Sequence, residues 1–156
     1  MYEAKIKGLL PNAKDWKDSA WPIARGSLLG FLLGILPGPG PVIASSFVSY
    51  AMEKRLSLYP EKFGTGVIEG VAGPEAANNA ATAGSFLPLL SLGIPTSAIM
   101  ALLMGALMIH GIQPGPLFIA KYPELFWGFI ASMYVGNAAG AQSTADRDVG
   151  ESPEDA

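Results

Sequence analysis

Charged and apolar positions fall in separate blocks along this chain. Long charge-free intervals lie between Arg25 and Glu53, between Glu75 and Lys121, and between Glu124 and Asp146. Charge-free apolar stretches of this length are typical of membrane-embedded segments. Because prolines and glycines interrupt these blocks, the pattern predicts an all-α integral membrane fold with transmembrane and re-entrant, discontinuous helices.

The first apolar block, residues 26–52, is interrupted at its centre by Pro37-Gly38-Pro39-Gly40-Pro41. A continuous helix cannot pass through alternate prolines, which lack the donor N–H. The arms on each side, 26–36 and 42–52, are each about 16 Å long as helices, roughly half of a ~30 Å hydrocarbon core. Basic residues flank both ends, so we expect a re-entrant hairpin. The alternative is one kinked transmembrane helix.

Three glycines in the first arm, Gly26, Gly30 and Gly34, recur every fourth residue. This spacing places them on one helix face, where another backbone can approach closely. We interpret this face as a helix-packing surface without a functional role.

The second apolar block predicts a helix from Pro74 to about Leu92, with proline at the first position and an acid in the first turn. The sequence Gly93-Ile94-Pro95-Thr96 should break it. Helix should resume over residues 97–110 and break again over residues 111–116. A last apolar stretch covers residues 125–135.

Composition adds three expectations. Only 15% of the 156 residues are charged and half are hydrophobic, with a mean hydropathy of +0.34, whereas about a quarter of the residues are charged in soluble domains. The chain divides into a polar N-terminal segment (1–24, a loop or surface helix), a membrane region (25–136) and an acidic tail expected to be disordered (137–156). The absence of cysteine excludes disulfides and thiolate chemistry.

Broken helices are the main functional signal. A half-helix N-terminus offers unpaired N–H groups and a positive dipole end to an anion, and transporters bind substrates at such sites. The predicted substrate-binding residues come from both breaks and from an adjacent amide pair: Pro37, Gly38, Gly40, Pro41, Asn78, Asn79, Gly93, Pro95, Thr96 and Ser97. Simple helix capping by Thr96 or Ser97, and inter-helix hydrogen bonding by the two amides, are the structural alternatives.

Few side chains are candidates for binding a coupling ion or for acid–base chemistry. Glu75, Asn78 and Asn79 are candidate groups for a coupling ion, although Glu75 at a membrane interface would simply be a helix N-terminal acid. His110 is expected to act as a C-terminal polar cap. No metal-ligand pair, nucleophile–base motif or phosphate-binding loop occurs, so we predict no catalytic residue and no metal site. An intramembrane enzyme using Glu69, Glu75 or His110, and a small membrane protein that only assembles with others, remain the alternatives.

Five segments carry a family resemblance: GILPGPGP (34–41), EKFGTGVIEG (61–70), PEAANNA (74–80), LPLLSLGIP (87–95) and GIQPGP (111–116). In this order they resemble the large membrane subunit of tripartite tricarboxylate transporters, the TctA family. The resemblance covers about residues 21–136 and is to the start of the second half of that subunit. It implies a fragment of an inverted-repeat secondary transporter.

The resemblance further implies a multi-pass protein of the cell inner membrane that moves tricarboxylates or related organic anions by symport with a cation, Na⁺ or H⁺. Its implied partners are a periplasmic solute-binding protein, a small membrane subunit and the lipid bilayer, with no nucleic acid, no cofactor and no enzymatic activity. The family's motifs fall on residues 37–41, 75–79 and 93–95. Thr96 departs from the glycine expected in many relatives, and the acidic tail departs from the expected further helices, as a truncation, frameshift or fragment would.

Overall fold

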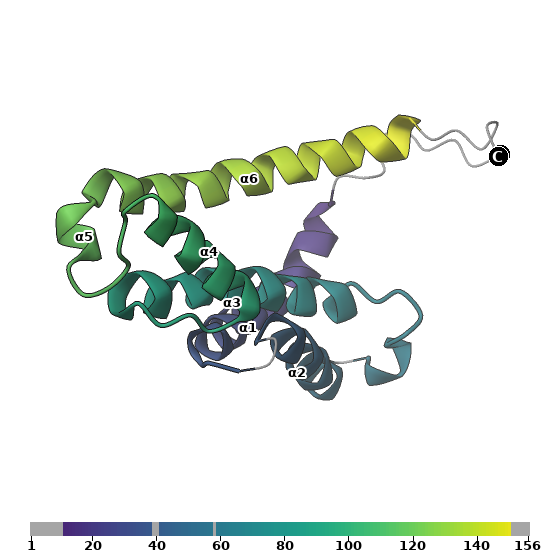
Figure 1. Ribbon diagram of the computed structural model, residues 1–156. Helices are drawn as coiled ribbons and strands as arrows, with labels where there is room; N and C mark the ends of the chain where they lie inside the picture. The colour runs from purple at the N-terminus through teal and green to yellow at the C-terminus, as the bar shows by residue number, and fades with distance from the viewer. Residues whose placement is uncertain (1–10, 39–40, 58, 151–156) are drawn as a thin grey trace.

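The computed structural model describes residues 11–38, 41–57 and 59–150. Every regular element among them is helical, which confirms the all-α prediction (Figure 1). In chain order they are α1 (Ala13–Ile35), α2 (Pro41–Leu56), the 3₁₀ turn η2 (Pro60–Lys62), α3 (Glu69–Leu92), α4 (Ala98–Ile109), α5 (Phe118–Lys121) and α6 (Pro123–Gly150).

Helices α1, α2 and α3 pack into a bundle in which α1 makes its most extensive contact with α3. The glycine face of α1 forms this contact. A Cβ built on Gly30 would lie 2.6 Å from the Cα of Ala77, and one on Gly34 would lie 2.8 Å from the Cα of Ala81. Only glycine permits this approach, so the prediction of a helix-packing face is confirmed.

The proline-rich break is present, because α1 ends at Ile35 and α2 begins at Pro41. However, the prediction of two half-length arms is wrong for the first one, since α1 has 23 residues and begins at Ala13. The side chain of Asn12 caps its N-terminus and forms a capping box with Asp15, which allows the polar segment to join the apolar one in a single helix. The expected boundary at residues 24/25 therefore falls inside α1.

Helix α3 begins at Glu69, five residues before the predicted start, and Pro74 lies inside it. Glu69 takes the first-turn position that complements the helix dipole. The predicted end is confirmed: Gly93, at φ 71°, caps the helix in the left-handed conformation and its N–H donates to the carbonyl of Leu89 at 3.0 Å. This conformation favours glycine.

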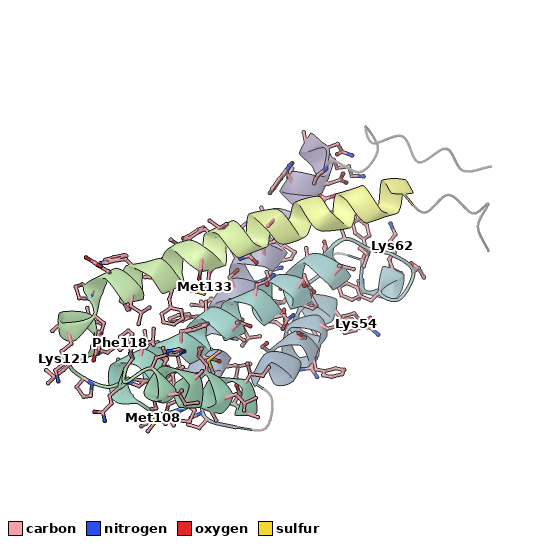
Figure 2. All side chains as sticks on the ribbon, turned by 45° about the horizontal axis from the view of Figure 1, so that its top comes forward. Lys54, Lys62, Met108, Phe118, Lys121 and Met133 are labelled. Carbon is pink, nitrogen blue, oxygen red and sulfur yellow. The ribbon has the colours of Figure 1, made fainter. Side chains whose placement is uncertain are left out.

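The second half of α3 packs with α4, α5 and α6 around a small apolar core of Leu89, Leu90, Met100, Leu107 and Phe118. Phe118 lies at the end where α5 turns into α6 (Figure 2). The structure continues α6 to Gly150, whereas we expected disorder from residue 137; frequent alanines over 138–145, which have high helix propensity, account for the helix. Residues 151–156 of the predicted tail lie outside the described residues.

Within the described ranges, none of the helices combines the length and hydropathy needed to cross a membrane.

Candidate functional site

The two predicted helix breaks meet in the structure. The backbone N–H of Gly38, between α1 and α2, donates a hydrogen bond of 3.3 Å to the backbone carbonyl of Thr96, between α3 and α4. Pro37 and Gly38 are exposed beside this contact. Gly40 lies outside the described residues, and for Pro41 the structure gives its position as the first residue of α2 but not its side-chain environment.

This contact brings two helix N-termini to one region. Helix α2 starts three residues after Gly38, so its first residue lies at most about 11 Å from Gly38. Helix α4 starts two residues after Thr96. A helix N-terminus carries a partial positive charge, so the region is suited electrostatically to an anion.

Thr96 supplies a buried polar atom at this point. The residue is 2% exposed, and its Oγ1 has no protein hydrogen-bond partner among the described residues. A buried hydroxyl without a partner is costly, and such groups require a structural or functional explanation. A buried hydroxyl without a protein partner among the described residues therefore lies in the break between α3 and α4.

Ser97 follows the structural alternative. Its side-chain oxygen accepts a hydrogen bond of 3.3 Å from the backbone N–H of Met100, which makes it the N-cap of α4. The third break, residues 111–116, packs against the end of α3. Gly93 lies against the carbonyl of Pro114, and the N–H of Gly115 donates to the carbonyl of Leu90 at 3.1 Å. Pro95, between Gly93 and Thr96 in the sequence, is half-buried. All three breaks thus gather around the C-terminal half of α3.

The predicted amide pair lies elsewhere on α3. Asn78 follows Ala77 in the contact with α1, and its Oδ1 is buried without a protein partner among the described residues. Asn79 is exposed and lines a groove between α3 and α6. Within the described residues no hydrogen bond joins either amide to a break. Gly30, which packs on Ala77, lies five residues before the end of α1 at Ile35, so roughly 7.5 Å of helix rise separates the amide pair from the end of α1 where the first break begins.

The charged candidates are also dispersed. Glu75 is exposed on α3. His110 is exposed and is the C-cap of α4, where its backbone N–H donates to the last carbonyls of the helix, as the capping interpretation predicted. Glu69 is the first residue of α3, whereas His110 follows the last residue of α4. Figure 2 shows Lys62, in the turn before α3, and Met108, in the last turn of α4, far apart in the molecule. The structure does not assemble these groups into one site.

Sequence reasoning missed an ion pair at the open end of the α1–α2 hairpin. Arg25 donates to both carboxylate oxygens of Glu53, from Nε at 3.0 Å and from Nη2 at 2.5 Å. The Glu53 side chain is 0% exposed and that of Arg25 is 34% exposed. A signal was available, because these two residues are the charges that border the first charge-free interval.

The ion pair also bears on the predicted hairpin. It joins the middle of α1 to the C-terminal end of α2, so the two helices fold back on each other with their break at the opposite end. The hairpin shape is therefore observed. Its position relative to a bilayer stays a prediction.

Comparison with known families decides what kind of protein carries these features. The sequence profile of the tripartite tricarboxylate transporter TctA family matches residues 1–144. The chain belongs to the TctA family. Membership in a transporter family indicates a membrane protein with a role in transport, in agreement with the resemblance seen in the five sequence motifs.

Two curated relatives of this TctA chain come from Agrobacterium vitis. An uncharacterized 52.8 kDa protein in the TAR-I ttuC′ 3′ region is 54% identical over 133 residues, which is 85% of this chain and 26% of the relative. An uncharacterized protein in the TAR-II ttuC′ 3′ region is 61% identical over 108 residues, 69% of this chain and 44% of the relative. The chain thus spans less than half the length of these relatives. No solved structure matches it.

Proposed function

We propose that this chain forms one section of the large membrane subunit of a tripartite secondary transporter for tricarboxylates or related organic anions. In this proposal the subunit lies in the cell inner membrane as a multi-pass protein and uses a gradient of Na⁺ or H⁺. It receives its substrate from a periplasmic solute-binding protein and works with a small membrane subunit. Family membership and the greater length of the relatives support this proposal.

The observation that carries the proposal is the contact between the two helix breaks. A carboxylate is an acceptor with two oxygens, and the N-termini of α2 and α4 offer donors without the desolvation cost of a buried basic side chain. Thr96 Oγ1 adds a hydroxyl that can donate to the same anion. Secondary transporters use paired discontinuous helices in this way.

The test uses the full-length subunit that contains this sequence, co-expressed with its binding protein and small subunit in membrane vesicles. Thr96→Val keeps the shape of the side chain but removes its hydroxyl. Because a hydrogen bond to a charged group contributes about 1.5–3 kcal/mol, KM for labelled tricarboxylate should rise about 10- to 150-fold. Thr82→Val is the matched control, since Thr82 is exposed and its hydroxyl donates to the Asn78 carbonyl within α3.

Wild-type uptake that depends on the cation gradient and on the binding protein would support the whole assignment. Equal KM values for Thr96→Val and Thr82→Val, at equal amounts of inserted protein, would remove Thr96 from the substrate site. Uptake of no organic anion by the assembled wild-type system would overturn the proposal.

A further inference from the structure

A groove runs between α3 and α6, two helices that lie along each other in opposite directions (Figure 1). It consists of two hollows of about 210 and 430 Å³, which share Ala83, Ile130 and Met133 and are therefore continuous. Along each helix the lining residues recur every three or four positions, so one face of α3 and one face of α6 form the walls. Figure 2 shows Met133 on the side of α6 that faces α3.

One end of the groove is apolar and narrow. Phe86 and Leu90 line it from α3, and Phe126 and Phe129 line it from α6. The rings of Phe86 and Phe129 touch across it, with their centroids 5.8 Å apart. A third helix between α3 and α6 would set their axes about 16–20 Å apart, twice the usual distance between packed helices, and would separate these rings. A flexible hydrocarbon chain is narrower and can follow such a slot.

The other end of the groove offers neutral hydrogen-bond donors. Asn79 lines it from α3, and Tyr134 and Asn137 line it from α6. None of the described residues that line either part of the groove is charged. Amide N–H and phenol O–H groups donate to carbonyl and phosphate oxygens. The groove therefore fits a molecule with a long apolar part and an oxygen-rich end that accepts hydrogen bonds.

The length of the groove agrees with one hydrocarbon chain of a bilayer leaflet. From Asn79 to Leu90 the α3 wall rises about 16 Å, roughly half of a ~30 Å hydrocarbon core. We propose that the groove binds one phospholipid, with an acyl chain between the phenylalanines and the glycerol ester carbonyls at Asn79, Tyr134 and Asn137. The membrane location that this requires follows from membership in the TctA family.

The bound lipid would join α6 to the rest of the structure. Among the described helices, only α5 makes an extensive contact with α6. An acyl chain between the facing walls of α3 and α6 would replace direct packing of these helices by apolar contacts with both. The proposal does not depend on which anion the transporter carries, because it concerns a lipid contact and not the substrate site.

The experiment is native mass spectrometry of the full-length subunit that contains this sequence, purified in detergent and stripped of lipid. Titration with palmitoyl-oleoyl phosphatidylethanolamine should give an adduct of one lipid at concentrations below those that produce further adducts. Ala83→Leu places a larger side chain at the point that both hollows share. Overpacking of this kind should weaken the first adduct about 5- to 150-fold. Ala131→Leu, at an exposed position of α6 outside the groove, is the matched control and should bind lipid like the wild type.

Asn137→Leu tests the polar end separately, and the loss of one neutral hydrogen bond should weaken the adduct about 2- to 12-fold. A wild-type subunit without a preferred one-lipid adduct would overturn the proposal. Equal lipid binding by Ala83→Leu and Ala131→Leu would also overturn it and would indicate that another segment of the subunit fills the groove. Displacement of the lipid by citrate would overturn it in favour of a substrate site. If Ala83→Leu does not fold, unchanged binding by Asn137→Leu refutes the proposal.

Discussion

Substitution of Gly30 by alanine should unfold the helix bundle more easily, because no space exists for a methyl group at the α1–α3 contact. The new Cβ would lie 2.6 Å from the Cα of Ala77 and closer still to its carbonyl oxygen, whereas ordinary contacts are 3.4 Å or longer. The helices must therefore separate by about an ångström, which forfeits a quarter to a half of the local dispersion energy. The bond from Ser85 Oγ to the Gly34 carbonyl, 3.1 Å long, would stretch with them.

Overpacking typically costs about 1–3 kcal/mol, and a lost hydrogen bond between membrane helices about 0.6 kcal/mol, so we expect a loss of about 2–4 kcal/mol. Gly105→Ala is the matched control, since a Cβ at this helical position of α4 would meet no atom within 4 Å apart from its chain neighbours and the adjacent backbone of its own helix. Its stability should rise by up to about 1 kcal/mol through helix propensity. Denaturant titration in mixed micelles measures both values. Equal stability of the two variants would refute the close packing of α1 on α3.

Three further outcomes are expected. Asn78→Ala or Asn79→Ala should reduce uptake by the complete transporter more than the amount of inserted protein, because Asn78 Oδ1 stabilises no protein hydrogen bond in the described structure; parallel losses would favour a folding role. Cysteines at Arg25 and Lys54 should react with an impermeant reagent from the same side of the membrane, and labelling from opposite sides would exclude the re-entrant hairpin. Ser97→Ala should lower unfolding stability by about 1 kcal/mol through loss of the N-cap, which a thermal shift would show, and an unchanged Tm would contradict the capping role.

Local features of the fold were predictable because they depend on neighbouring residues. Proline and glycine at residues 37–41 end one helix and start another whatever surrounds them, and Gly93 takes a conformation that other residues avoid. The helix starts at Ala13 and Glu69 were missed for a related reason. We treated Arg25 and Pro74 as boundaries, yet a capping box and a first-turn acid nearer the N-terminus allowed each helix to begin earlier.

The long-range pairings could not be obtained from spacing. The glycine period on α1 indicated a close partner but not that Ala77 and Ala81 of α3 would provide it. Likewise, each break was visible alone, whereas the hydrogen bond between Gly38 and Thr96 depends on how two hairpins pack. Of the predicted binding residues, Gly38 and Thr96 are joined by a backbone hydrogen bond. The positions of the amide pair and of Glu75 depend instead on which face of α3 each side chain occupies.

The packing of the bundle limits where a conformational change can occur. Glycine-to-backbone contacts along α1 and α3 leave no room for one helix to slide past the other, and the Arg25–Glu53 pair fastens α2 to the same body. The contact between Gly38 and Thr96 is different, because it joins this body to the break before α4 through a backbone bond beside an exposed glycine. Secondary transporters move one rigid group of helices against another around the substrate. In the proposed transporter we therefore expect the surface of relative motion to pass through the contact of the two breaks, where a bound carboxylate would bridge the N-termini of α2 and α4 and couple substrate binding to the movement.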